Sequence, residues 1–167
     1  VSASRSPSFA SHERAHGGGD VGRLRQRGLL QVLGVRDRYV GHRDPLHVTA
    51  QELLEDLHVG AAALLTAVQA ARPAMPAGAR ITVTGSMAAD HPWHEACTLG
   101  AQKAALRNLV RSLDATLAPE GIRAMSLTVK GTLASDTAFT PDRVADAIYT
   151  AAGTRDEDWR DEVVYAG

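Results

Sequence analysis

The residues best suited to chemistry lie close together in the sequence, between positions 86 and 103. Ser86 offers a hydroxyl that can hydrogen-bond an oxygen atom, and Lys103 offers an ammonium group. His91 and His94 lie between them, and histidine titrates near neutral pH. Together these groups are suited to polarising a carbonyl. The alternative is structural: Ser86 satisfies backbone groups at a strand end, Lys103 is a solvated helix residue, and the histidines have no role.

Hydrophobic patterning predicts the elements that position these residues. Residues 81–84 are an apolar, β-branched run, which predicts a buried strand that delivers Ser86 at its carboxyl end. The Ala- and Leu-rich residues 97–117 predict a long helix that carries Lys103. The other predicted elements are a helix over 50–71 with a Thr49/Glu52 capping box, a strand at 122–129, a helix with Thr140 as N-cap and Pro141 at its first position, and a strand at 162–165. This alternation is typical of an α/β protein with a parallel sheet.

The first 44 residues differ from the rest, because they are rich in Arg, Ser, His and Gly and show little apolar periodicity. We expect disorder over residues 1–20 and a short strand within 29–35. Residues 17–22 match G-x-G-x-x-G formally, but neither a buried strand nor an amphipathic helix flanks them, which indicates a linker. The sequence therefore predicts a poorly ordered or divergent segment over 1–44 and one domain over 45–167. An altered reading frame or start site is an alternative origin of the first segment.

The stretch 80–110 resembles the catalytic half of the short-chain dehydrogenase/reductases. The family motif is a serine after the strand, a tyrosine thirteen residues on and a lysine four residues after the tyrosine; Ser86, Leu99 and Lys103 stand at these positions. Residues 117–131, LAPEGIRAMSLTVKG, resemble the family's LAPxGIRVNxVxPG segment. The resemblance covers residues 45–167 and implies a Rossmann-like parallel sheet with helices on both faces. It also implies that the N-terminal dinucleotide-binding half is incomplete or divergent.

The family resemblance implies an oxidoreductase that moves hydride between NAD or NADP and a carbonyl or alcohol. In the family, tyrosine donates the proton, lysine lowers the tyrosine pKa and binds the nicotinamide ribose, and serine hydrogen-bonds the oxygen. Ser86 and Lys103 are therefore the expected catalytic residues, while Leu99 occupies the tyrosine position and His58 the position of a supporting asparagine. Lys103, Gly131 and Thr132 are the expected cofactor-binding residues.

The missing tyrosine and glycine-rich loop predict a weak or inactive enzyme that binds NAD(P) no more tightly than about 1 mM. His91 or His94 is the alternative proton donor. A second hypothesis is a non-catalytic Rossmann-like module for binding or oligomerisation. No metal site is predicted, because no third ligand accompanies the two histidines.

The composition limits the classes of partner that we expect for this protein. A net charge of −1 over 167 residues favours neither nucleic acid nor an anionic membrane, and we find no uninterrupted apolar run of membrane-spanning length. Cys97 is the single cysteine, which excludes an internal disulfide, fits a reducing compartment and leads us to expect a cytoplasmic protein. Ala and Leu on more than one face of the helices near 61–65 and 101–109 predict a homodimer or larger, with a small-molecule substrate if the protein is active.

Overall fold

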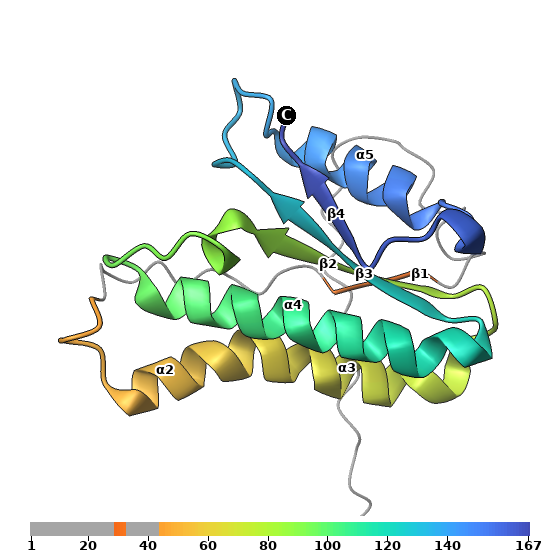
Figure 1. Cartoon of the computed structure of the whole chain (residues 1–167), viewed down its shortest axis with the longest axis horizontal. Coiled ribbons are helices and arrows are strands. Elements are labelled where there is room, and N and C mark those ends of the chain that lie inside the picture. The colour runs from red at the N-terminus through yellow and green to blue at the C-terminus, as the bar shows by residue number, and fades with distance from the viewer. Residues whose placement is uncertain (1–28, 33–43) are drawn as a thin grey trace, which may run out of the picture.

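The computed structural model describes residues 29–32 and 44–167, which form an α/β structure around one four-stranded sheet. The strands are β1 (Leu29–Val32), β2 (Arg80–Ser86), β3 (Arg123–Val129) and β4 (Glu162–Tyr165). Their order in the sheet is their order in the chain, and each neighbouring pair is parallel. The predicted parallel pairing of the strands around residues 81–84 and 122–129 is confirmed, with helix α4 as the connection between them (Figure 1).

Helices cover both faces of this sheet (Figure 1). They are α2 (Ala50–Leu57), the π-helical segment η1 (His58–Ala62), α3 (Ala63–Ala71), α4 (Cys97–Leu117) and α5 (Pro141–Ala152), with the 3-10 turns η2 (Arg72–Ala74), η3 (Met87–Ala89), η4 (Ala118–Glu120) and η5 (Asp156–Asp158). The predicted helix starts are confirmed. Thr49 and Glu52 form a reciprocal capping box, and the Thr140 side chain accepts a hydrogen bond from the amide of Arg143.

Successive side chains of strand β3 point to opposite faces of the sheet and belong to two separate hydrophobic cores. Ala124 belongs to the core formed with α3, α4 and β2, which includes Leu64, Ile81, Val83 and Val110. On the opposite face, Met125, Leu127 and Val129 pack in a second core under α5, which includes Val144, Ile148 and Trp159. The period of two along β3 thus produces the three-layer arrangement, with α4 and α3 on one side and α5 on the other.

The long helix predicted over residues 50–71 is helical throughout, but its middle differs from a regular α-helix. Residues 58–62 are π-helical, and the amide of Ala63 donates to the carbonyl of His58, five residues earlier. The carbonyl of Asp56, just before this segment, accepts a hydrogen bond from the Gln102 side-chain amide of α4, at 2.7 Å. Gly60 makes this approach possible, because a Cβ there would lie 2.1 Å from Gln102 Cγ. Tertiary packing between two helices therefore accounts for a change that local sequence signals did not predict.

The sheet includes part of the N-terminal segment, residues 1–44, that was expected to be poorly ordered or divergent. The strand expected within residues 29–35 is present as β1, residues 29–32, which pairs parallel with β2. The expectations for residues 1–20 and for the glycine motif at 17–22 lie outside the described residues.

One helical stretch bears on the expectation about apolar length, although charged and polar residues interrupt it. By length and composition alone, Ala50–Ala74 is long and apolar enough to cross a membrane. A single such helix is weak evidence of a membrane protein, because helices of globular proteins also meet these criteria. Only 11% of its most apolar window is buried, however, so much of this apolar surface remains uncovered.

Candidate functional site at the carboxyl edge of the sheet

The candidate site residues gather where the parallel strands end. Ser86 ends β2, and in the sheet register it pairs with Val129 of β3, which in turn pairs with Tyr165 of β4. Each helix in such a fold returns antiparallel to the strands, so the first turn of α4 lies at this same edge (Figure 1). Crevices at the carboxyl ends of parallel strands are the usual ligand sites of open α/β sheets.

Ser86 is half-buried and its hydroxyl has a structural contact. The side-chain oxygen accepts a hydrogen bond from the amide of Ala88 at 3.2 Å, and so caps the η3 turn. A hydroxyl keeps its own proton while it accepts, so Ser86 can still donate a hydrogen bond to a ligand oxygen. No hydrogen bond joins its side chain to a titratable side chain in the described part of the chain. The structural alternative for Ser86 is therefore compatible with the functional one.

Lys103 is buried, with 8% of its surface exposed, which excludes the alternative of a solvated helix residue. Its ammonium group donates to the backbone carbonyl of Thr84 at 3.3 Å. No carboxylate pairs with it within residues 44–167. An ammonium group has three donors, so at least two remain for a ligand. Buried cations without an anionic partner are costly, which makes this lysine a strong candidate for a binding role.

Leu99 lies one turn before Lys103 on α4, so the two residues share a helix face. It is half-buried. The next residue, Gly100, packs on the η3 turn, since a Cβ there would lie 3.0 Å from the carbonyl oxygen of Ala88. The first turn of α4 is thus held against the turn that Ser86 caps. At the position where the family motif has tyrosine, this edge of the sheet presents an aliphatic side chain.

The other predicted site residues are less closely associated with Ser86 and Lys103. His58 is exposed at the start of the π-helical segment. Thr132 is exposed in the loop after β3. Gly131 lies against the ring of Phe139, since a Cβ at Gly131 would be 2.3 Å from that ring. No hydrogen bond in the described residues connects these three positions to Ser86 or Lys103.

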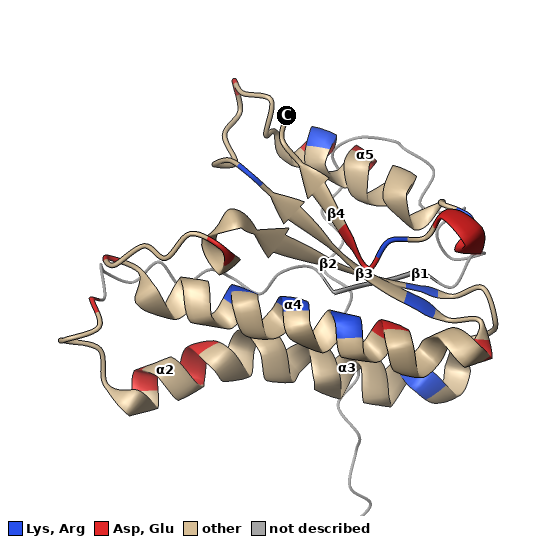
Figure 2. Ribbon diagram, in the orientation of Figure 1, with Lys and Arg blue, Asp and Glu red and all other residues tan. Residues whose placement is uncertain are grey.

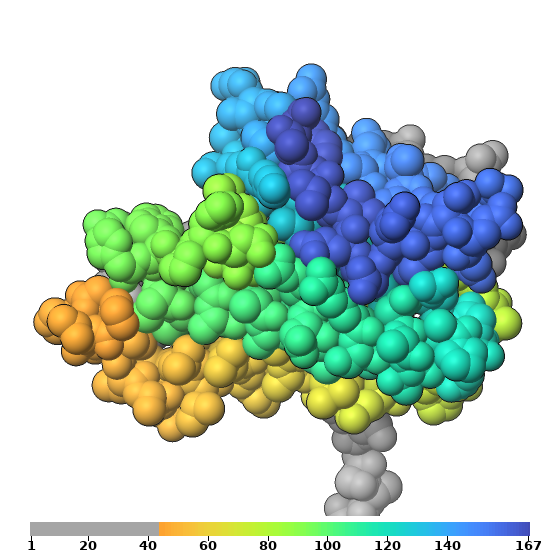
Figure 3. Space-filling model, viewed as in Figure 1, coloured from red at the N-terminus to blue at the C-terminus, as the bar shows by residue number. Residues whose placement is uncertain are grey.

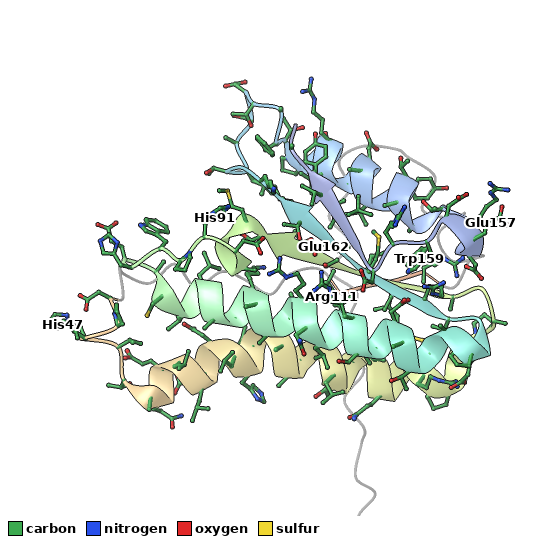
Figure 4. All side chains as sticks on the ribbon, viewed as in Figure 1. His47, His91, Arg111, Glu157, Trp159 and Glu162 are labelled. Atoms are coloured by element: carbon green, nitrogen blue, oxygen red, sulfur yellow. The ribbon has the colours of Figure 1, made fainter. Side chains whose placement is uncertain are left out.

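A network of charged side chains that was not predicted from the sequence lies beside this edge. Arg107, one turn after Lys103, forms a bidentate ion pair with Asp90 in the loop after η3, at 2.7 and 2.9 Å. Arg107 also contacts Glu162 of β4 at 3.3 Å, and Arg111 holds the other oxygen of that carboxylate at 2.8 Å. Figure 4 shows Arg111 and Glu162 together between α4 and the sheet, and Figure 2 shows basic residues along this side of α4. The i, i+4 spacing of 103, 107 and 111 is the sequence signal that points to this stripe.

The network bears on whether Asp90 could take the place of the tyrosine that the family motif has at position 99. The hydrogen bonds that Arg107 donates to Asp90 hold the pKa of Asp90 below its ordinary value, so this carboxylate is ionised at neutral pH. Asp90 therefore cannot supply the proton that a tyrosine would give. His91 and His94 are exposed in the same loop, and His91 lies at the end toward which β2 runs (Figure 4).

The described residues fit one end of a nicotinamide dinucleotide better than the other. Lys103 has free donors for ribose hydroxyls. The two fully described strand-to-helix connections, residues 87–96 and 130–140, lack the glycine-rich sequence that lets backbone amides approach a pyrophosphate. The fit is therefore limited to the nicotinamide–ribose end.

Comparison with solved structures gives relatives with the same fold. A short-chain dehydrogenase from Streptomyces avermitilis is 16% identical, with a TM-score of 0.69 over 86% of this chain and 63% of that chain. A metagenomic short-chain oxidoreductase in complex with NADP is 24% identical, with a TM-score of 0.64 over 86% and 64%. The promiscuous reductase LugOII, which catalyses keto-reduction at C1 during lugdunomycin biosynthesis, is 27% identical, with a TM-score of 0.57 over 65% and 49%. The chain thus spans less than two thirds of the length of each.

Comparison at the level of families covers most of the chain. No curated protein sequence matches it significantly. The family model described as enoyl-(acyl carrier protein) reductase matches residues 24–154, which includes β1 and begins before the boundary expected at residue 45. This match, the parallel sheet and the solved relatives agree. The chain belongs to the short-chain dehydrogenase/reductase family.

Proposed function

We propose that this protein is a carbonyl-binding member of the family whose site lacks the proton donor for efficient reduction. In this proposal Ser86 donates a hydrogen bond to a carbonyl oxygen at the end of β2. Lys103 supplies the buried positive charge beside it. A carbonyl ligand is favoured because LugOII, the relative at 27% identity, carries out keto-reduction. The proposal thus extends the oxidoreductase family assignment to a weak or inactive member.

The observation that carries the proposal is the aliphatic side chain of Leu99, one helical turn from the buried ammonium group of Lys103. A positioned general acid accelerates reactions typically by about 10²–10⁴-fold. Leu99 has no proton to give, and the nearby carboxylate Asp90 is ionised and paired with Arg107. Ligand polarisation without proton transfer is therefore the chemistry that these residues support.

Cofactor binding is part of the proposal only at one end of the molecule. NADP is bound by the metagenomic relative, and bound nicotinamide would supply hydride chemistry. In this chain Lys103 would hold the ribose beside it, and Gly131 and Thr132 remain the proposed neighbours on the loop after β3. Because the glycine-rich pyrophosphate contacts have no counterpart in residues 44–167, we assign no hydride-transfer step.

Calorimetric titration of the full chain with NADPH and NADH tests this limit. We expect dissociation constants of about 1 mM or weaker, because residues 44–167 offer no counterpart to several charge-assisted hydrogen bonds of roughly 1.5–3 kcal/mol each. A dissociation constant in the micromolar range would contradict the proposal. It would show that residues 17–22, or another part of the first 43 residues, form a working phosphate loop.

A second candidate function is self-association, and the exposed apolar helix favours it. The helical run Ala50–Ala74 is strongly apolar but mostly unburied, and Leu54 and Leu65 are 59% and 38% exposed. Apolar surface of this kind is usually covered by a partner. A second copy of the chain would cover it through the same helices, which makes the protein a homodimer or larger. Light scattering at tens of micromolar, an order-of-magnitude choice for a specific interface, should find no monomer; a monomer would contradict this function.

A further inference from the structure

The positive charge of Lys103 has no negative partner among residues 29–32 and 44–167. Its ammonium group donates to the backbone carbonyl of Thr84, which is a neutral group, and at least two of its donors remain. A buried cation is costly unless it is paired, and a carboxylate forms stronger hydrogen bonds with an ammonium group than a neutral acceptor does. The surroundings of Lys103 therefore favour a negatively charged ligand group over a neutral one.

The carboxylates beside this edge of the sheet are neutralised by arginine side chains and not by Lys103. Asp90 is held by Arg107 at 2.7 and 2.9 Å. Glu162 accepts hydrogen bonds from Arg111 at 2.8 Å and from the Thr128 hydroxyl at 2.6 Å. Both carboxylates thus have partners of their own, and the charge of Lys103 remains available to a ligand.

Lys103 and Ser86 lie close enough to bind one small molecule. The Lys103 nitrogen contacts the Thr84 carbonyl oxygen, and Ser86 is two residues further along β2. Two residues of a strand span about 7 Å. A ligand with two neighbouring oxygen groups, each in a hydrogen bond of about 2.8 Å, can bridge such a separation. Figure 3 shows the loop after β2 against the first turns of α4, in agreement with the close approach of Gly100 to the Ala88 carbonyl.

We infer that the site takes 2-oxo carboxylates, small anions whose ketone oxygen accepts a hydrogen bond from Ser86 while the adjacent carboxylate pairs with Lys103. This inference rests on the proposed carbonyl-binding function and adds the charge of the ligand. Leu99, on the helix face that it shares with Lys103, offers no polar group that would compete for the carboxylate. Neutral ketones should therefore be weaker ligands than 2-oxo carboxylates of similar size.

Ligand-observed NMR titration of the full chain, without cofactor and near neutral pH, tests this charge preference. The two ligands are pyruvate and pyruvamide, which share the ketone and differ in that pyruvamide has a neutral amide in place of the carboxylate. We expect pyruvate to bind at least about tenfold more tightly, because its hydrogen bonds with Lys103 are charge-assisted. Equal affinities would overturn the inference.

Two lysine variants locate the charge that pyruvate recognises. Lys103→Met should weaken pyruvate binding by about tenfold or more and remove the preference over pyruvamide. Lys130→Met is the matched control, because it removes the same charge from an exposed residue directly after β3 and should change the affinity by less than about fivefold. A preference that survives in Lys103→Met, or that Lys130→Met abolishes equally, would overturn the inference.

Titration with acetate distinguishes this inference from the proposed function on which it rests. Acetate has a carboxylate but no ketone, so it should bind more weakly than pyruvate if Ser86 holds the ketone oxygen. Acetate binding as tight as that of pyruvate would refute the carbonyl site and leave the preference of Lys103 for anions. Equal binding of pyruvate and pyruvamide would instead refute the preference for anions and leave the carbonyl site.

Discussion

The ammonium nitrogen of Lys103 lies 3.3 Å from the carbonyl oxygen of Thr84, on the strand that ends two residues later at Ser86. This contact fixes α4 to β2 beside the candidate site. It satisfies one donor of a buried cation by a neutral backbone group. The buried ammonium group of Lys103 therefore stabilises the folded state less than an apolar side chain of similar shape would.

Lys103→Met should therefore leave the stability unchanged or raise it by up to about 2 kcal/mol. The same variant should lose ketone binding, because the cation is removed from the site. Thermal unfolding and a ligand-observed NMR titration with the ketone 2-octanone measure the two effects, with Lys130→Met, at an exposed lysine after β3, as the control for loss of charge. A loss of more than about 2 kcal/mol would show that Lys103 is structural.

Asp114→Asn should destabilise the protein by roughly 3 kcal/mol at neutral pH, because it breaks a largely buried pair with Arg123. Burial acts to raise the pKa of Asp114, but hydrogen bonds from Arg123 and from the Ala124 amide outweigh it and hold the pKa below 3.8. A lowered folded-state pKa gives stability that is present above 3.8 and is lost as the pH falls through the folded value.

Denaturant unfolding of Asp114→Asn across pH measures this dependence. The stability difference from the unmodified chain should be constant near neutral pH and should shrink below about pH 4. Asp146→Asn, at an exposed position on α5, is the control and should change stability by no more than about 0.5 kcal/mol. A difference that grows on acidification would contradict the assigned direction.

Gly60→Ala tests the contact between η1 and α4. In the otherwise unmodified chain, the methyl group that this substitution adds should displace the Gln102 side chain and break its hydrogen bond to the Asp56 carbonyl. The loss of this hydrogen bond should offset the roughly 1 kcal/mol by which alanine is favoured over glycine in a helix. In a Gln102→Ala background the same change should stabilise by about 0.5–1 kcal/mol. A double-mutant cycle by denaturant unfolding should thus give a coupling near 1 kcal/mol, and additive effects would contradict the contact.

Local signals in the sequence predicted much of this fold. The Thr49/Glu52 capping box, Thr140 before Pro141 and the β-branched run before Ser86 each specify an element through neighbouring residues, and each is confirmed. The π-helical turn was not predictable in this way, because it depends on how Gly60 meets a residue of another helix.

The candidate site shows the same division. Spacing alone identified Ser86, Leu99 and Lys103 through the family motif. The burial of Lys103 and the pairing of Arg107 with Asp90 and Glu162 depend on residues far apart in the chain, so the sequence left them open. Trp159 is a similar case, since it packs under the guanidinium groups of Arg80 and Arg123 only in the folded protein.

Leu99→Tyr should not restore reductase activity. The new hydroxyl would lie one turn from Lys103, as in the family motif, but the described residues still lack pyrophosphate contacts to hold the dinucleotide. We expect NADPH oxidation with 2-octanone to stay within about tenfold of the rate without protein, since the acid alone cannot replace a positioned cofactor. Leu99→Phe is the matched control. A large gain in Leu99→Tyr but not in Leu99→Phe would show that cofactor binding is intact.

The most direct test of the central claim is the steady-state rate at which the unmodified full chain oxidises NADPH with 2-octanone near neutral pH. The proposed function predicts a rate at or close to that of the reaction without protein, because neither Leu99 nor the ion-paired Asp90 supplies the proton. A turnover number of about 1–1,000 per second, the ordinary range for enzymes, would contradict it. In that case His91 and His94 would be the first residues to replace.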